Sequence, residues 1–315
     1  MNILLFGSDH DPHLKTVQSK LQNKGVKTVI FDLNNKHNKI SLHMNEKDTQ
    51  GEFFVNDEMF SFEDIDKIWW RLKPNPYIGD NLDTHTIKDF ISTEWRSLLN
   101  NLYYYLPNTI WINHPESQYK ANFKTYQLSL AKKVGFQIPA TVFTNDANSI
   151  LSKLKESNRL IYKQIGWSMF PGGEVIFTNE VTKEILTENS DSISIAPGTF
   201  QELIEKEYEL RVTVVGSDVF AVKINSQENE STLIDWRHDQ LSVMYEPYEL
   251  SCSFKKMILE YTKLIDLKYG AFDFIKSKTN GYIFLECNPS GQWLWIEDKV
   301  ESYQITESLV NLFVK

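Results

Sequence analysis

Two long apolar segments joined by Asn280-Gly281 constrain this chain more than any other feature, in the stretch "YGAFDFIKSKTNGYIFLECNPSG". Asn and Gly both tolerate the positive φ of a two-residue hairpin turn, so the segments on either side are predicted to pair as antiparallel strands. With these two residues as the loop, Thr279 faces Tyr282 and Asp273 lies opposite Asn288. The C-terminal part of the chain is therefore expected to contain an antiparallel sheet.

The two faces of this hairpin differ in chemistry. Side chains alternate along a strand, so Glu286 shares a face with Asp273 and Asn288. Hard oxygen donors of this kind suit Mg²⁺, which keeps positions for water and phosphate oxygens. A solvated polar face is the alternative that the hairpin alone leaves open. The opposite face is expected to turn toward the core and carries Phe272, Phe274, Ile283, Leu285 and Cys287.

A glycine-containing loop lies earlier in the chain, in "LIYKQIGWSMFPGGEVIFT", where Lys163 ends an apolar strand and Gly172 and Gly173 follow. Glycines let backbone N–H groups approach phosphate oxygens, and a lysine on the strand reaches the same phosphates. An ordinary hairpin with glycines is the alternative. The next stretch, "FQELIEKEYELRVTVVGSDVFAVKI", predicts two strands whose polar residues include Glu209, Arg211 and Lys223.

The N-terminal part has the pattern of an α/β lobe. "NILLF", a run of apolar residues at helical spacing, Gly25 as a stop, and "VKTVIFDL" predict a strand, a helix and a strand. Short strands are expected between residues 41 and 70, and helices over residues 83–105 and 118–134. A strand near "NTIWINHPES" closes this lobe at about residue 113.

Composition limits the partners. A chain of 315 residues is expected to form two or three lobes. A net charge of -9 and the absence of a dense Lys/Arg run argue against nucleic acid as a partner. With no run of 18 apolar residues, we expect no membrane association and a cytoplasmic protein. Cys252 and Cys287 form no metal or disulfide pattern and are predicted to be buried thiols.

The order of these motifs resembles that of the ATP-grasp superfamily of carboxylate ligases, over about residues 113–291. In that family a lysine begins a helix that ends before a G-x-x-x-P stretch, as Lys124 does in "KTYQLSLAKKVGFQIP". A second lysine opens the glycine loop, which corresponds to Lys163. The family's Q-E-x-I hinge contacts adenine, and an acidic residue seven positions later holds the ribose. These nucleotide-binding roles fall on Glu202, Leu203, Ile204 and Glu209.

The same resemblance implies a phosphate and metal site. Arg211 and Lys223 fall where the family places cations on the phosphates. The pattern D…E-x-N assigns Mg²⁺ to Asp273, Glu286 and Asn288, the last also contacting the nucleotide. ATP and Mg²⁺ are thus implied, with phosphorylation of a carboxylate to an acyl phosphate that a nucleophile then attacks. Catalysis of this kind depends mostly on positioning and electrostatics.

The resemblance also implies an ATP-grasp α/β fold that encloses ATP between lobes. We predict an N-terminal α/β domain over residues 1–113, a central ATP-grasp subdomain over residues 114–200, and a C-terminal antiparallel-sheet subdomain over residues 201–315. A homodimer is expected.

Three further segments, "SDHDPHLKTV", "IWWRLKPNP" and "IDWRHD", resemble those of the graspetide, or microviridin-type, peptide maturases. These enzymes join Asp or Glu side chains of a ribosomally made precursor peptide to Thr or Ser hydroxyls as ω-esters, or to Lys as ω-amides. Their D-x-R motif contacts the core peptide and matches Asp235 and Arg237. A guanidinium suits this task because it binds a carboxylate bidentately. A salt-bridged surface turn is the alternative for this pair.

The predicted function is therefore ATP-dependent macrocyclisation of a precursor peptide, composed of leader and core, through ω-esters. An ω-amide macrocyclase, a ligase for small molecules or for adding amino acids to a protein, and a nucleotide-binding module without catalysis remain open. Trp69, Trp70 and Arg71 fit either a peptide groove or an apolar strand edge. The loop with Asp9, His10, Asp11 and His13 has no standard ligand spacing and is not predicted to bind a metal.

Overall fold

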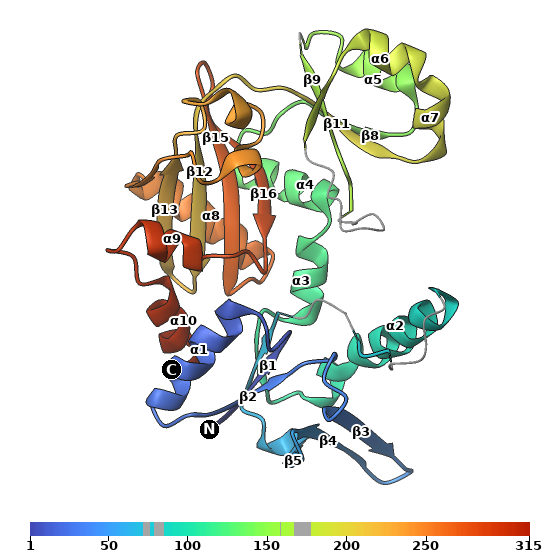
Figure 1. Cartoon of the computed structure of the whole chain (residues 1–315), viewed down its shortest axis with the longest axis vertical. Coiled ribbons are helices and arrows are strands. Elements are labelled where there is room, and N and C mark those ends of the chain that lie inside the picture. The colour runs from blue at the N-terminus through green and yellow to red at the C-terminus, as the bar shows by residue number, and fades with distance from the viewer. Residues whose placement is uncertain (72–75, 79–84, 158, 167–177) are drawn as a thin grey trace.

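A four-stranded parallel sheet forms the N-terminal part of the chain (Figure 1). The computed structural model describes residues 1–71, 76–78, 85–157, 159–166 and 178–315. Helix α1 (Pro12–Asn23) joins the first two strands, and the Asp11 carboxylate accepts a hydrogen bond from the His13 amide at its start. The predicted strand, helix and strand are confirmed. The strands, in sheet order, are β2 (Lys27–Phe31), β1 (Asn2–Phe6), β6 (Lys67–Trp70) and β7 (Ile110–Ile112).

A small antiparallel sheet extends from this lobe, at the lower edge of Figure 1. It confirms the short strands expected before residue 70 and is followed by the 3-10 turn η1 (Phe62–Asp64). Aromatic rings join the two sheets: the Phe6 ring centroid lies 5.7 Å from that of Phe53. The three strands are β3 (Lys39–Met44), β4 (Thr49–Val55) and β5 (Glu58–Ser61).

Both long predicted helices are divided in the structure. The first is α2 (His85–Leu99), followed by the separate 3-10 turn η2 (Leu102–Tyr105). The second is split into α3 (Pro115–Ala121) and α4 (Lys124–Val134). The split occurs because Phe123 is extended, with φ -80° and ψ 103°, and serves as the N-cap of α4. The two helices lie between the N-terminal sheet and the upper sheets (Figure 1).

The central lobe is an antiparallel sheet of four strands with its own small core. Buried Leu160 and Phe200 of the sheet pack with Ile150, Leu154 and Leu186 of the helices beside it. The last of its strands in the sequence ends at Glu202, beyond residue 200, where the central subdomain was predicted to end. Its strands, in sheet order, are β10 (Asn179–Val181), β9 (Leu160–Lys163), β11 (Gly198–Glu202) and β8 (Thr141–Thr144), and its helices are α5 (Ala147–Lys153), α6 (Lys183–Glu188) and α7 (Ser190–Ile195).

The largest sheet is C-terminal and antiparallel. One face packs against α4 and α8 (Cys252–Leu264), so α4 shares a core with this sheet although residue 124 falls in the predicted central subdomain. Helices α9 (Leu294–Lys299) and α10 (Ile305–Val314) pack toward α1. The strands, in sheet order, are β14 (Tyr245–Pro247), β13 (Asp218–Ile224), β12 (Lys206–Val215), β15 (Tyr269–Ser277) and β16 (Gly281–Asn288); the loop between β13 and β14 holds η3 (Glu230–Thr232) and η4 (Trp236–Asp239).

The hairpin of β15 and β16 exists as predicted, but its predicted register is wrong. Ser277 pairs with Gly281, which has φ +77°, so the loop is longer than two residues. A bulge at Leu285 then shifts the pairing again. As a result Asp273 lies opposite Glu286, and Asn288 lies opposite Ala271.

The bulge also changes which residues reach the core. Phe284, which pairs with Phe274, packs in the core with Phe272 and Cys287, whereas Leu285 is only partly buried. Ile283 is buried as predicted but lies outside this cluster.

The two cysteines differ in exposure. Cys287 is buried as predicted, whereas Cys252 is exposed because it begins α8, directly after the Ser251 cap. Within the described ranges no helix has the length and apolar character needed to cross a bilayer.

Candidate active site

Two carboxylates face each other at the edge of the C-terminal sheet. Asp273 of β15 and Glu286 of β16 are directly paired, and Asn288 is exposed at the end of β16. Because side chains alternate, all three lie on one face, as the sequence predicted. This is the face opposite to the core of Phe272 and Phe274.

Cationic side chains from three separate elements surround these carboxylates. Arg211 of β12 pairs with Asp273 across the sheet, and its Nη1 lies 2.8 Å from both carboxylate oxygens. Lys124, the first residue of α4, places Nζ 3.7 Å from Glu286 Oε2. Lys163 at the end of β9 donates to Gln201 Oε1 at 3.2 Å, and its charge interacts with that of Glu286. The structure thus brings Lys124, Lys163 and Arg211 together with the carboxylates.

Burial and the neighbouring charges shift the pKa values of Glu286 and Asp273 in opposite directions. Burial alone would raise the pKa of Glu286, but the charges of Lys124, Lys163 and Arg237 outweigh it and hold that pKa below its usual range. Burial raises the pKa of Asp273, and the neighbouring Glu286 adds to this while Arg211 opposes it. Two carboxylates this close in a partly buried place favour a bound cation.

Asp235 and Arg237 form an ion pair close enough to Glu286 and Asp273 for the charge of Arg237 to interact with theirs. Arg237 Nε is 2.8 Å from Asp235 Oδ1, and its Nη2 is 2.5 Å from Oδ2, so the guanidinium holds the carboxylate bidentately. Asp235 also caps the turn η4 through the Arg237 amide. Burial would raise the pKa of Asp235, yet Arg237 lowers it overall. The pair is a salt-bridged turn, and its arginine charge interacts with Glu286 and Asp273.

The predicted adenine hinge joins the central and C-terminal sheets. The Glu202 carboxylate accepts a hydrogen bond from the Ala140 amide at 2.9 Å, and the Leu203 amide donates to the Arg159 carbonyl at 2.9 Å. Ile204 is half-buried beside them. These contacts fix the hinge backbone.

Glu209 has a partner that the sequence did not indicate. Its Oε1 lies 2.6 Å from Nζ of Lys206, which also donates to the Ile234 carbonyl at 3.0 Å. Both side chains are buried, and Glu209 lies on the same face as Arg211, two residues away. Lys206 therefore orients the carboxylate predicted to hold the ribose.

Lys223 does not join this group. In the register of β12 and β13 it lies opposite Leu210, whereas Val222 lies opposite Arg211. Lys223 consequently extends from the other face, 3.4 Å from the Glu246 carboxylate and 5.2 Å from the centroid of the Tyr208 ring. This register places Lys223 on the other face from Arg211, and the phosphate role that the resemblance implies for Lys223 stays a prediction. Gly172 and Gly173 lie outside the described residues.

Gln127 is a residue of this site that the sequence analysis missed. Its Oε1 accepts from the Cys287 amide at 2.7 Å, and its Nε2 donates to the Cys287 carbonyl at 3.0 Å. β16 is the edge of its sheet, so this side chain takes the place of a neighbouring strand between Glu286 and Asn288. Its place one turn after Lys124 on the same helix was the available signal.

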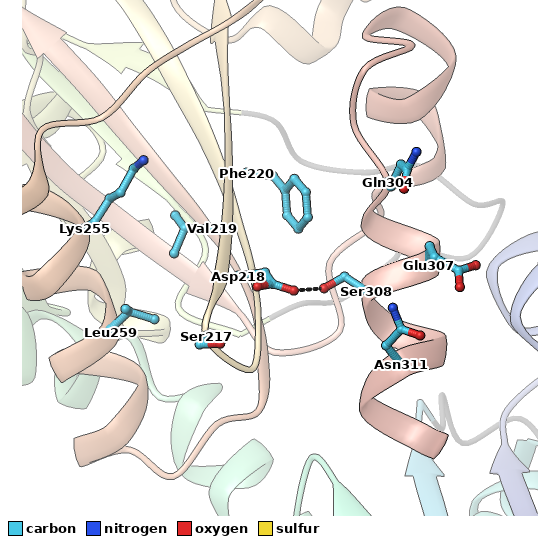
Figure 2. A pocket seen from close by; sticks show the side chains of 10 residues that line it. All are labelled: Ser217, Asp218, Val219, Phe220, Lys255, Leu259, Gln304, Glu307, Ser308 and Asn311. Carbon is cyan, nitrogen blue, oxygen red and sulfur yellow. Dashed lines mark hydrogen bonds between the residues drawn. The ribbon is translucent and has the colours of Figure 1, made fainter. Parts of the chain in front are cut away.

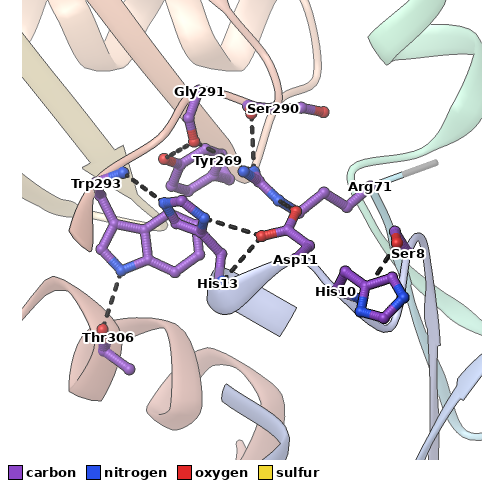
Figure 3. Close-up of polar contacts among 10 residues, drawn as sticks. All are labelled: Ser8, His10, Asp11, His13, Arg71, Tyr269, Ser290, Gly291, Trp293 and Thr306. Atoms are coloured by element: carbon purple, nitrogen blue, oxygen red, sulfur yellow. Dashed lines mark hydrogen bonds and ion pairs between the residues drawn. The ribbon is translucent and has the colours of Figure 1, made fainter. Parts of the chain in front are cut away.

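The donor set fits Mg²⁺ with phosphates. Carboxylate and amide oxygens are hard ligands, and the lysines and arginine beside them suit phosphate groups. Asp273 and Glu286 supply carboxylate oxygens, and Mg²⁺ typically completes its coordination with water and substrate phosphates. The loop with Asp11 and His13 instead forms a hydrogen-bond network (Figure 3).

A separate hollow of about 550 Å³ lies between α8 and α10, at the start of β13 (Figure 2). The Ser308 hydroxyl donates to the Asp218 carboxylate across it. It has no part in the carboxylate site, because none of the candidate residues line it. The side chains that it exposes include Ser217, Asp218, Phe220, Lys255, Glu307 and Ser308.

The family of the chain follows from comparison with known proteins. The model of the RimK-like ATP-grasp domain matches residues 120–311, which is more than half of the chain and contains every candidate residue described above. The chain therefore belongs to the RimK-like ATP-grasp family, and the predicted ATP-grasp ligase is confirmed. A comparison with curated proteins found no match.

Similarity to solved structures extends over the whole chain. The RiPP-associated ATP-grasp ligase of Chryseobacterium gregarium, in complex with ADP and a leader and core peptide, has 28% identity and a TM-score of 0.84, covering 99% of this chain and 96% of that one. Macrocyclase MdnC from Microcystis aeruginosa MRC, bound with precursor peptide MdnA, has 26% identity and a TM-score of 0.88, covering 100% and 99%. These matches confirm the predicted ATP-grasp fold and the resemblance to peptide macrocyclases of this class.

The ligase PsnB, complexed with a phosphomimetic variant of its minimal precursor, Mg and ADP, is similar in fold. Its identity is 21% and its TM-score 0.74, covering 99% of this chain and 97% of that one.

The affinity for ATP is expected to fall as the pH rises through about 8. Burial lowers the pKa of Lys163 to about 8, so its ammonium attracts phosphates below that pH and is lost above it. Loss of one such contact corresponds to about tenfold in affinity, or ~1.4 kcal/mol. Calorimetric titration with a non-hydrolysable ATP analogue across this pH range measures the effect. Lys163→Arg stays charged and should show little change; an equal decline in both proteins would assign the titration to another group.

Proposed function

We propose that this chain is an ATP-dependent ligase that closes rings in a ribosomally made precursor peptide through ω-esters. In this proposal an Asp or Glu side chain of the core peptide is activated by ATP, and a Thr or Ser hydroxyl of the same peptide attacks it. ATP and the peptide are the substrates, and Mg²⁺ is the metal.

The observation that carries the proposal is the convergence on one face of Asp273, Glu286 and Asn288 with Arg211 and two lysines. These residues come from different parts of the chain and meet where a nucleotide would reach both the hinge and the carboxylates. The Asp235 and Arg237 pair lies within charge range of the same place. A single site can then hold ATP and a peptide carboxylate together.

The chemical steps balance without an enzyme nucleophile. A peptide carboxylate oxygen attacks the γ-phosphorus, forming an acyl phosphate and releasing ADP. The hydroxyl oxygen then attacks the acyl carbon and expels inorganic phosphate, so the peptide loses one water for each ring. Lys124, Lys163 and Arg211 bind phosphate oxygens, and Arg237 orients the carboxylate. Holding the reacting groups together removes much of the entropic barrier.

The metal would be held by Asp273, Glu286 and Asn288. When bound, Mg²⁺ neutralises charge on the phosphates during transfer. Arg211 keeps the Asp273 carboxylate oriented toward this place.

The peptide partner is supported by two of the similar solved structures. The proteins with 28% and 26% identity are described with leader and core or precursor peptides, and the similarity covers 96% and 99% of those chains. We extend such a partner, with a leader and a core, to this chain. The expected homodimer and the cytoplasmic location remain predictions, as do the three domain boundaries.

Ring formation is expected to produce ω-esters. Incubated with ATP, Mg²⁺ and its precursor peptide, the enzyme should release ADP and lower the peptide mass by one water for each ring. Mild alkaline hydrolysis should restore one water for each ring, because esters are more labile than amides. Mass spectrometry before and after hydrolysis measures both steps.

The control is a precursor in which the Thr and Ser residues of the core are replaced by Ala, which should remain unmodified. A product that keeps its mass in alkali, with links mapped to Lys, would identify an ω-amide macrocyclase. ADP release with free amino acids and no need for a leader would favour a ligase of small molecules or one that adds amino acids to a protein.

A further inference from the structure

The segment directly after Asn288 is held by side chains from the N-terminal half of the chain (Figure 3). Arg71, which follows β6, donates from Nη1 to the Ser290 carbonyl at 2.8 Å and to the Gly291 carbonyl at 3.2 Å. Asn113, after β7, donates from Nδ2 to the Pro289 carbonyl at 2.9 Å. The backbone from residue 289 to 291 is therefore fixed by elements more than 150 residues earlier in the chain.

Arg71 is itself held in a closed ring of contacts. Its Nε donates to Asp11 Oδ2 at 2.8 Å, and Asp11 Oδ1 lies 2.9 Å from His13 Nδ1. His13 Nε2 accepts from the Trp293 amide at 3.2 Å, which places the proton of the imidazole on Nδ1. The ring closes because Trp293 follows the segment that Arg71 binds. The side chain of Arg71 is only 4% exposed.

A side chain of α3 also binds this segment. Gln118 Nε2 donates to the Ser290 hydroxyl at 2.8 Å. A little earlier, Gln127 of α4 binds both backbone groups of Cys287. Asn288 thus lies between two stretches of backbone that are each fixed by side chains of other elements.

The segment also passes close to the carboxylate site. A Cβ added to Gly291 would lie 2.4 Å from the Ala271 Cβ and 3.5 Å from Arg211 Nη2, so only glycine permits this approach. Ala271 is the residue paired with Asn288. A displacement of the segment would therefore move Asn288 and the surroundings of Arg211 together.

We infer that Arg71, oriented by Asp11, is a positioning residue for the metal site: it fixes Asn288 through the carbonyls of Ser290 and Gly291 without touching the nucleotide. This rests on the proposed function of Asp273, Glu286 and Asn288 as Mg²⁺ ligands. Partners that orient metal ligands typically contribute about 10-fold to 100-fold to metal affinity.

The test compares Arg71→Met with Lys67→Met. Both remove a buried cation of nearly equal exposure from the same stretch of chain, 6% and 7%, but only Arg71 contacts the segment after Asn288. Mn²⁺ binding in the presence of ADP is titrated by electron paramagnetic resonance, ADP binding without metal by calorimetry, and stability by thermal unfolding. Arg71→Met is expected to weaken Mn²⁺ binding at least tenfold and to weaken ADP binding without metal by a clearly smaller factor, while Lys67→Met alters neither.

Arg71→Lys restores a donor without the fork and should give an intermediate Mn²⁺ affinity. Gln118→Leu, which removes the hydrogen bond to the Ser290 hydroxyl of the same segment, serves if Arg71→Met does not fold, and it should also weaken Mn²⁺ binding. Parent-like Mn²⁺ affinity in Arg71→Met, or in Gln118→Leu when the first variant is unfolded, overturns the inference.

Glu286→Gln distinguishes a failure of the proposed metal site from a failure of the role inferred for Arg71. If the parent binds Mn²⁺ with ADP and Glu286→Gln abolishes that binding, the metal site stands and Arg71→Met alone decides the inference. If Glu286→Gln binds Mn²⁺ as well as the parent does, the proposed metal site is wrong, and the inference falls with it.

Discussion

Replacing Glu286 by Gln is expected to lower ADP formation by at least about 10²-fold while leaving the fold intact, because the change removes one charge from the proposed metal and phosphate site. Its ion pair with Lys124 spans 3.7 Å between side chains about 30% exposed, so its loss should cost at most about 1 kcal/mol of stability. Asn288→Ala, at an exposed strand end, should have a similar effect on turnover. Coupled-enzyme measurement of ADP and thermal unfolding test both parts.

Glu246→Gln is the matched control, since it removes a carboxylate from β14 of the same sheet, paired with Lys223 instead of the site. ADP formation at near parental rates in Glu286→Gln and Asn288→Ala would contradict the metal assignment. Asp273→Asn is a poorer test, because it leaves the buried Arg211 guanidinium without its carboxylate, a change that typically costs about 3–5 kcal/mol.

Arg237→Ala is expected to abolish peptide modification while ATP still binds. The guanidinium is about half exposed and is held at the site by Asp235, so it is placed to receive a carboxylate from solution. Calorimetry with nucleotide and mass spectrometry of the peptide separate the two functions. Arg237→Lys keeps the charge but not the fork, and it should also lose most peptide modification.

Arg159→Ala is the matched control for this experiment, because Arg159 forms a comparable bidentate pair with Glu180 on the central sheet, at 2.6 and 2.5 Å. It should keep both functions. A fall in ATP affinity of about a hundredfold in Arg237→Ala, equal to roughly 2.7 kcal/mol, would place Arg237 in the phosphate site.

Local sequence patterns predicted which segments form strands and helices better than they predicted the register in which the strands pair. The hairpin of β15 and β16 follows from its apolar segments and its turn residues. Asp273 still shares a face with Glu286 and Asn288 because the observed pairing differs from the predicted one by two residues, which preserves the face. The register depended on the turn geometry at Gly281 and on the bulge at Leu285, and neither has a signal in the strand pattern itself. Lys223 was assigned to the phosphates from the order of family motifs, which carries no information on the register between β12 and β13, and one residue of register decides the face of a strand.

The contacts that hold the site were not predictable from any single segment. Gln127 and Arg71 bind the backbone near Asn288 from elements that are distant in sequence, and polar residues within a helix or after a strand have many possible partners. The lysines were predicted because their order along the chain resembles that of a family. Gln127 and Arg71, which hold the backbone of the site, belong to no such ordered set of motifs.

The small core of the central sheet has a consequence for how the protein opens. Local opening free energy depends on the apolar contacts that a region loses. Ile150, Leu154, Leu160, Leu186 and Phe200 form a core separate from the more extensive one beneath β12 and β15. Amide hydrogens of β9 and β11 should therefore exchange with solvent faster than those of β12 and β15. Because Lys163 ends β9, a nucleotide that bridges it to Glu286 would slow that exchange by linking the weaker core to the stronger one.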